Sequence, residues 1–537
     1  MKLIIIFFAC IMAASLASCK KDVLNKEPLG EISSDLVFKD VNMATLFVDG
    51  IYLNLFGGIE RNLDCATEIA DDGPEWHPVQ AWNSGDVTGS YNALEDWYSQ
   101  WGTDYKQIRS ANLVLEKVAN LKGDPEKIGQ LRGQAFFLRA YFYSDLLQFY
   151  GGVPIIKKAQ KLGDDLNVSR NSYEECISFI VADLDSASEL LPLMWEGSNV
   201  GRATKGAALA IKSRMLLHAA SPLHNTSNDP ARWQAAANAA KAVIDLDVYE
   251  LHPDYYKVFH EDNNQEVIFD IQYAYPTRVQ HTELKQNPQG MAGAWGELRP
   301  TEEFVSSYAM NDGKKITDPS SGYNPQDPYK DRDPRFYATV LYNGAPWRGE
   351  AVETFVDGAH GPGNQDIYNT GVTMTGYYTR KFINEKNINS QDVIKSEENW
   401  ILMRYAEVLL NYAEAQLHLG NEAEAKVYIN KIRERAGMPS LAGSETGAAL
   451  MALYQNERKL ELAFEEIYFF DVRRWKTAPS LLSVPVHKMH IIKNANGSFT
   501  YNVKEMEDRV WRDAFYYYPI PIDEINKNSN LDQNPGY

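Results

Sequence analysis

The chain has 537 residues, of which 44% are hydrophobic and 12% aromatic, and its formal net charge at pH 7 is −19. A chain of this length exceeds one ordinary hydrophobic core, so we expect either several subregions or one long helical array. The acidity argues against a nucleic-acid partner, because a phosphate-binding surface needs a basic patch and the sequence contains none.

The N-terminus is typical of a lipidated, exported protein. An apolar run from Leu3 to Leu16 is too short for the roughly 20 residues that a membrane span needs. The run ends Leu16-Ala17-Ser18-Cys19, which looks like a bacterial lipobox, so we predict a signal peptide at residues 1–18 and a lipid on Cys19. Residues 19–34 are predicted to be the lipidated N-terminus and tether. The alternative is an ordinary cleavage site followed by a chance cysteine.

Helical periodicity dominates the first half of the body, which we place at residues 35–537. Between the first two helices, residues 57–91 are polar, rich in Gly, Asp and Trp, and without a period, which is typical of a functional segment. We assign Trp97 and Trp101, which fall near helical spacing, to the core. The predicted helices cover residues 41–55, 93–118, 125–150, 173–191, 203–220 and 233–246.

An irregular lobe is predicted after these helices, at about residues 266–399. A short strand at 267–271 opens it, and beyond Tyr273 periodicity gives way to Gly, Pro, Asn, Asp and aromatic residues. The acidic run from Asp327 to Phe336 has the oxygen ligands that calcium prefers. A turn held by Asp–Arg pairs is the interpretation that we favour for this run.

A helix pair is predicted in the second half, at residues 400–419 and 422–436. Arg404, Glu407, Asn411, Glu414 and His418 form one narrow polar stripe on the first helix, and most of the remaining surface is apolar. Small residues lie where the two helices would cross, which is the spacing of a tetratricopeptide pair. A further helix at 457–475 would stack on this pair.

The chain closes with a predicted hairpin and tail. Residues 487–504 form the hairpin, which turns at Asn496-Gly497. His487 and His490 fall on opposite faces of it and make no metal pair. The predicted layout is a helical scaffold at 35–265 and 400–480, the irregular lobe, and the hairpin and tail at 481–537. The fold class is therefore mainly α, with tetratricopeptide-like helix pairs, a loop-rich lobe with short strands and a small hairpin.

Several blocks together resemble the SusD/RagB family of outer-membrane nutrient-binding lipoproteins. The blocks are LRGQAFFLRAYFYSDLLQFYGGVPII from Leu131, RATKGAALAIKSRMLLHAASP from Arg202, RYAEVLLNYAEA from Arg404, ERKLELAFEEIYFFDVRRW from Glu457 and the ending YPIPIDEIN…NPGY. The resemblance implies four tetratricopeptide-like units and a variable lobe that contributes to ligand binding. It also implies a cell-surface lipoprotein that sits on a SusC-like TonB-dependent outer-membrane transporter and feeds it glycan oligomers.

A glycan site needs exposed aromatic rings beside hydrogen-bonding side chains, because sugars present flat CH faces and rings of hydroxyls. One ring on one sugar is worth roughly 2 kcal/mol at about 25 cal/mol per Å². We looked for such groups in the aperiodic segments. The predicted ligand-binding residues are Asp72, Trp76, Trp82, Asn83, Trp295, Arg299, Tyr323 and Trp347.

We predict a noncovalent oligosaccharide binder with no catalytic residues, no metal and no cofactor. The sequence contains no nucleophile elbow, phosphate loop or zinc motif. One alternative is a lipid-anchored glycoside hydrolase, which would need two carboxylates about 5–10 Å apart across a cleft. A peptide-binding member of the same family is another.

Overall fold

The computed structural model describes residues 37–57, 61–72, 77–161, 163–291, 294–363, 373–389, 395–441 and 443–537. The predicted signal peptide, lipidation site at Cys19 and tether lie outside these residues. The described part is mainly helical, and each sheet within it has two strands. The predicted fold class is therefore confirmed.

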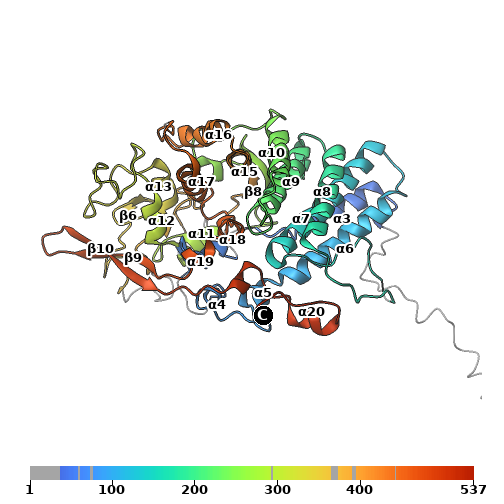
Figure 1. The fold of residues 1–537 in the computed structure, drawn as a ribbon, viewed down its shortest axis with the longest axis horizontal. Coiled ribbons are helices and arrows are strands. Elements are labelled where there is room, and N and C mark those ends of the chain that lie inside the picture. The colour runs from blue at the N-terminus through green and yellow to red at the C-terminus, as the bar shows by residue number, and fades with distance from the viewer. Residues whose placement is uncertain are drawn as a thin grey trace, which may run out of the picture.

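The helices of the first half form an array in which each helix packs on the next in chain order (Figure 1). Asp124 begins one of them by accepting the Glu126 N–H at 3.0 Å ahead of Pro125, and Ser172 with Glu175 forms a capping box at another. The array consists of α3 (Val41–Tyr52), α6 (Gln100–Val118), α7 (Pro125–Tyr150), α8 (Tyr173–Leu190), α9 (Lys205–Ala220) and α10 (Pro230–Ile244).

The chain leaves this array after α10 and rejoins it much later. The helix α15 (Tyr405–His418) packs on α10 and on α16 (Glu422–Arg435), and so continues the same stack. The small residues Ala413 and Ala425 are fully buried, as the predicted crossing of α15 and α16 requires. The helical array is thus one stack built from two parts of the chain.

The predicted helix at 400–419 is wrong over its first five residues. The strand β8 (Trp400–Arg404) pairs antiparallel with β2 (Val267–Ile271), and Trp400 stands opposite Ile271. The apolar run at this position suits a buried strand and a buried helix equally. A strand partner far away in the sequence decides between them.

Two other predicted helices are interrupted. Ser99 adopts a left-handed conformation with φ 49°, which separates α5 (Ala93–Tyr98) from α6. Residues with positive φ at Phe464 and Glu466 likewise separate α17 (Gly447–Glu461) from α18 (Tyr468–Arg474). The first break matters for the site, because it turns Trp97 outward while Trp101 stays buried.

The polar stripe on α15 is covered by neighbouring helices. Glu414 accepts hydrogen bonds from Arg474 at 2.6 and 2.7 Å and from the Trp475 indole at 2.7 Å. His418 stacks on Trp233, with ring centroids 3.7 Å apart. Trp475 belongs to the core, as does Trp400. The stripe therefore binds helices together instead of facing water.

The irregular lobe is built from very short elements, as predicted. A small second core of Trp347, Leu341, Val352 and Tyr378 lies inside it. Asp333 pairs with Arg335 at 2.8 Å and caps a helix, which confirms the turn interpretation for the acidic run. The elements are α11 (Thr282–Gln286), β3 (Arg299–Pro300), α12 (Glu302–Ser307), α13 (Pro334–Thr339), β4 (Val340–Leu341), β5 (Pro346–Trp347), β6 (Glu350–Ala351) and β7 (Tyr378–Thr379).

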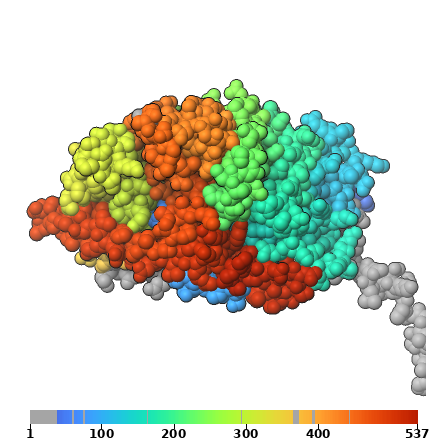
Figure 2. All heavy atoms as spheres, in the orientation of Figure 1, coloured from blue at the N-terminus to red at the C-terminus, as the bar shows by residue number. Residues whose placement is uncertain are grey.

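The C-terminal part of the chain runs along the molecule. In Figure 2 it is drawn in red and extends along the lower side, from the protruding hairpin at one end to the helical array at the other. The hairpin consists of β9 (Val486–Lys493) and β10 (Phe499–Glu507), with Gly497 at φ 84° in the turn. After it come a 3-10 turn (Asp513–Tyr516) and α20 (Ile522–Lys527), and α19 (Ala478–Leu481) precedes it.

The hairpin histidines lie on opposite faces, as predicted. His487 bonds Glu303, whereas His490 stands opposite Asn502 on the other face. Among the described helices, none combines the length and the apolar character needed to cross a bilayer.

Candidate functional site

A two-stranded ladder joins the aperiodic segment near the N-terminus to the irregular lobe. The strand β1 (Ala70–Asp71) follows a 3-10 turn (Leu63–Ala66) and pairs antiparallel with β3, so that Asp71 stands opposite Arg299. The Thr301 hydroxyl extends the contact by donating to the carbonyl of Glu68 at 2.5 Å. Two of the predicted groups of ligand-binding residues, more than 200 positions apart in the sequence, are thereby brought together.

Buried polar groups form the centre of this site. Asp72 contacts the His77 imidazole and accepts a hydrogen bond from Gln80 at 2.8 Å. Arg299 lies 3.9 Å from the carboxylate of Asp71 and donates to the carbonyl of Gly296 at 2.7 Å. Gln80 opens α4 (Gln80–Asn83), a single helical turn. The centre is a frame of side chains that contact one another and the backbone.

The end of the hairpin adds a third carboxylate to the frame. Burial raises the pKa of Glu507 to about 7, and the negative charges of Asp71 and Asp72 raise it further. The positive charge of Arg509 acts in the opposite direction. Burial also raises the pKa of Asp71, against the effect of Arg299. Arg509 holds the segments in place by donating to the carbonyls of Cys65 and Ala70, each at 3.0 Å.

Two exposed tryptophans belong to the segments that build the frame. Trp295 is 49% exposed, and because only four residues separate it from Arg299, the two α-carbons are at most about 14 Å apart. Its backbone N–H is fixed by the carbonyl of Leu284 at 2.9 Å. Trp97 is 57% exposed, and its ring centroid lies 6.2 Å from that of His77. Each ring therefore presents a broad apolar surface to solvent.

Trp97 is the residue that the sequence analysis missed. Its spacing from Trp101 places both rings on one face of an uninterrupted helix, and only the left-handed Ser99 separates them. No local sequence signal marks that break, since serine is neither a glycine nor a proline. Trp76, another of the predicted residues, lies outside the described residues.

Two of the predicted platforms are buried, so the expectation that they face solvent is wrong. Trp82 is 3% exposed and packs on Phe515 and Tyr518, with ring centroids 5.0 and 4.7 Å away. Trp347 is fully buried, and its indole N–H donates to Asn287 at 3.3 Å. An aperiodic segment can still supply core side chains when another part of the chain covers it, as the C-terminal segment covers Trp82.

The remaining predicted residues support the site or lie in the lobe. Asp72, Asn83 and Arg299 are buried, and Asn83 donates to the carbonyl of Cys65 at 3.2 Å. They hold the frame from within. Tyr323 is half-buried in the lobe, where the Arg332 guanidinium lies 5.5 Å from its ring centroid. Ligand contact by any of these residues stays a prediction.

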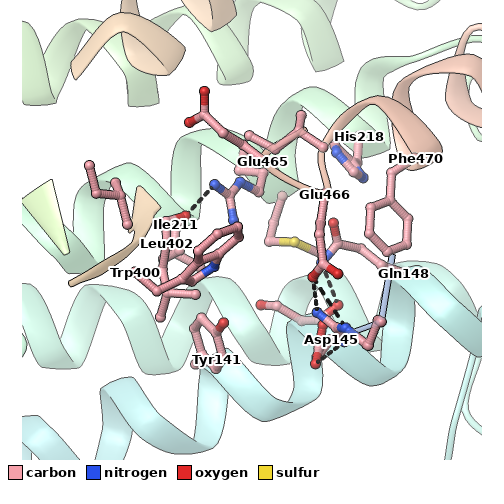
Figure 3. Close-up of a pocket in the computed structure, with 16 residues that line it drawn as sticks. Tyr141, Asp145, Gln148, Ile211, His218, Trp400, Leu402, Glu465, Glu466 and Phe470 are labelled. Atoms are coloured by element: carbon pink, nitrogen blue, oxygen red, sulfur yellow. Dashed lines mark hydrogen bonds and ion pairs between the residues drawn. The ribbon is translucent and has the colours of Figure 1, made fainter. Parts of the chain in front are cut away.

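An internal polar cavity lies between α7, α9 and β8 (Figure 3). Arg61 bridges Asp145 at 3.4 Å and Glu466 at 3.0 Å within it. Its volume of about 60 Å³ is far below the 300–1,000 Å³ of typical ligand pockets but is large enough for water. This cavity therefore does not suit an oligosaccharide.

A larger groove of about 540 Å³ separates the lobe from α16 and α17. On its helical side, Arg433 of α16 pairs with Glu457 of α17 at 2.8 Å. The aromatic residue among its described lining residues is Tyr308, which is fully buried. Because this groove offers no ring for a sugar to stack on, the site around the β1–β3 ladder is the better candidate.

No cluster of His, Cys, Asp and Glu side chains within the described residues could hold a metal ion. The expectation that the protein uses neither a metal nor a cofactor stays a prediction.

Known proteins are similar to this chain over nearly its whole length. Two family models match: the SusD family over residues 265–537, and one described as starch-binding, associating with outer membrane, over residues 59–217. SusD-like protein P2 of Formosa agariphila is 25% identical, and the match covers 98% of each chain.

Solved structures agree with these matches. A SusD-like protein from Bacteroides fragilis superposes with a TM-score of 0.81 at 29% identity, over 95% of this chain and 100% of that one. A SusD-like carbohydrate binding protein from the same organism superposes with a TM-score of 0.79 at 25% identity, over 92% and 100%.

Proposed function

Since the chain belongs to the SusD family, we propose that it binds oligosaccharides noncovalently and passes them to a TonB-dependent outer-membrane transporter. A lipid on Cys19 is proposed to hold it at the cell surface. The printed names of its relatives support this proposal: one family model is described as starch-binding and associating with outer membrane, and one similar structure is a carbohydrate binding protein.

The observation that carries the proposal is the pair of exposed tryptophans on the segments that build the polar frame. A side chain of this size is normally buried, and here Trp97 and Trp295 keep about half of their surface in solvent. Each ring stacked on a sugar contributes roughly 2 kcal/mol. Two rings account for roughly half of the about −8 kcal/mol that corresponds to micromolar binding, and hydrogen bonds to the sugar hydroxyls add to it.

The roles of the other residues follow from their burial. We assign Asp72 and Arg299 to positioning, because both are buried and satisfied within the frame. Gln80 and Glu507 are partly exposed at its edge and are proposed to hydrogen-bond the sugar hydroxyls.

Titration of the full chain in detergent with a panel of oligosaccharides tests the proposal. Trp97→Ala and Trp295→Ala should each weaken binding about 10- to 100-fold, with the melting temperature almost unchanged. Met194→Ala is the matched control, since Met194 is 70% exposed on the loop between α8 and α9. It should leave affinity unchanged.

Three results would contradict the proposal. Unaltered affinity in both tryptophan variants would remove the site from consideration. Shortened oligosaccharides recovered after incubation would place the protein among the glycoside hydrolases. Binding of peptides in preference to all sugars tested would favour the peptide-binding alternative.

A further inference from the structure

The arginines of the segments that build the candidate site are all engaged by the protein itself. Arg299 is buried between Asp71 and the carbonyl of Gly296, at 3.9 and 2.7 Å. Arg509 is buried and donates to two carbonyls, and Glu507 lies 3.1 Å from it. A bound ligand would find neither guanidinium available.

Two further arginines complete the inventory. Arg61 is occupied by Gln100, Asp145 and Glu466 inside the molecule. Arg512 donates to the carbonyls of Gly85, Val87 and Gly536. The segments that build the site, at residues 61–72, 77–98, 294–300 and 507–512, carry these four arginines and no lysine.

Acidic residues outnumber these arginines and include exposed ones. The same four segments contain ten Asp and Glu residues, of which Asp86, Asp96 and Asp508 are exposed. The short stretches that adjoin these segments in sequence, residues 58–60, 73–76 and 292–293, add Glu60 and Glu75 and contain no Lys or Arg. Within the described residues of these four segments, every arginine is therefore committed to a protein partner, and the neighbouring Lys285 lies 3.7 Å from Glu297.

The negative charges at the site also raise the pKa values of carboxyl groups within it. Burial raises the pKa of Asp96, and the carboxylate of Asp523 raises it further. Burial raises the pKa of Glu507 to about 7, and Asp71 and Asp72 add to the shift. Another anion placed among these groups would be repelled in the same way.

From this geometry we propose that the site accepts uncharged oligosaccharides and discriminates against anionic ones, such as sulfated or uronate-bearing glycans. The inference rests on the proposed function and narrows its ligand class. An anionic glycan would have to approach exposed carboxylates, and recognition of sulfate or carboxylate normally needs an available Arg or Lys. A neutral glycan needs only the aromatic rings and hydrogen-bonding groups that the site presents.

Matched pairs of probes test this inference on the full chain in detergent. The probes are neutral hexasaccharides of glucose, mannose, galactose and xylose, each beside its own sulfated form. At low salt, any neutral hexamer that binds should bind at least about 10-fold more tightly than its sulfated form. The ratio of the sulfated to the neutral dissociation constant should shrink in 0.5 M NaCl, since added salt screens exposed charges.

Reversing the charge of one acidic residue tests whether the discrimination against sulfated probes arises at the site. Asp96→Lys, beside Trp97, should lower the ratio of sulfated to neutral dissociation constants several-fold. Glu189→Lys is the matched control, because Glu189 is an exposed acid on α8, and it should leave the ratio unchanged. An identical shift in both variants would assign the discrimination to net charge and overturn the assignment to the site.

The outcomes separate this inference from the proposed function. Sulfated hexamers that bind as tightly as neutral ones, or more tightly, would overturn the charge selectivity and leave oligosaccharide binding intact. Absence of binding by every hexamer, neutral or sulfated, would overturn oligosaccharide binding itself and the selectivity with it.

Discussion

At the scale of single residues, burial separates tryptophans that look alike in the sequence. Trp82 and Trp295 both occur in aperiodic, polar stretches, yet the first packs among aromatic rings of the C-terminal segment and the second faces solvent. Trp82→Ala should therefore lower the free energy of unfolding by about 3–5 kcal/mol. Trp295→Ala should change it by no more than about 0.5 kcal/mol.

Urea titration of both variants measures this difference. If Trp82→Ala left the unfolding midpoint unchanged, the packing of Trp82 on Phe515 and Tyr518 would be refuted.

A buried carboxyl group makes a second residue-level prediction, concerning pH. Burial and the nearby Glu466 raise the pKa of Asp64 from 3.8 to about 8. The folded state therefore binds a proton that the unfolded state has released, so stability falls as pH rises from about 4 to about 8, by up to about 1.4 kcal/mol per unit. Asp64→Asn mimics the protonated carboxyl and removes this contribution.

Unfolding free energies at pH 5.5, 6.5 and 7.5 test the Asp64 prediction. The variant should gain stability relative to the natural protein as pH rises. Parallel pH profiles for the two proteins would contradict the raised pKa.

At the scale of elements, small residues allow the helices to approach closely. Ala425 on α16 is fully buried at the crossing with α15, so Ala425→Leu should cost about 1–3 kcal/mol through overpacking. Val427→Leu is the matched control, because Val427 lies on the same helix and is exposed. Thermal unfolding should shift for the first variant only, and equal shifts would refute the close crossing.

The helices were largely predictable because their signals are local. Caps such as Asp124 with Pro125, and Ser172 with Glu175, stand beside each periodic run that they begin. The strand at 400–404 could not be predicted in this way, because its partner strand lies about 130 positions earlier in the chain. The short helix that carries Trp97 was missed because a serine in an unusual conformation separates it from α6.

The candidate site was likewise predictable only where the signal is local. Composition alone indicated Trp295, Asp72 and Arg299, and a strand ladder between distant segments brings their neighbourhoods together. The exposure of an aromatic ring depends on what covers it. For Trp82 and Trp347 that cover comes from remote parts of the chain, which a sequence window cannot include.

At the scale of the whole molecule, a buried ion network joins the scaffold to the lobe. Glu461 on α17 bonds Arg404 of β8, Arg435 of α16 and Arg335 of the lobe, two of these contacts being at 2.7 and 3.2 Å. These arginines hold the pKa of Glu461 well below its usual range, against the effect of burial. Glu461→Gln should cost about 3–5 kcal/mol at pH 7, because it leaves buried charges uncompensated.

The pH dependence of that loss has a definite sign. A depressed carboxyl pKa stabilises the fold above the unfolded value of about 4.5. The difference between Glu461→Gln and the natural protein should therefore stay constant from pH 7 to about 5 and shrink below pH 4.5. Glu189→Gln, at an exposed position, should match the natural protein throughout. A loss that persisted undiminished at pH 3 would contradict the charge argument.

The anchor makes a prediction for the molecule in its cell. Because lipidation needs the thiol, Cys19→Ala should release the protein from the membrane fraction without lowering its melting temperature. Fractionation in a strain without the partner transporter measures this directly. Continued recovery of the variant with outer membranes in that strain would contradict lipid anchoring.

The helical stack has one further consequence, which concerns the order in which it can form. Its sixth helix, α10, ends at residue 244, and the helix that covers it, α15, begins only at residue 405. At roughly 5–20 residues per second, synthesis of the intervening chain takes on the order of 10–30 s. During that interval α10 has α9 as a native neighbour, but the face that α15 will cover has none. Completion of the stack must therefore follow emergence of the C-terminal third, and a nascent chain halted within the lobe should require a chaperone to stay soluble.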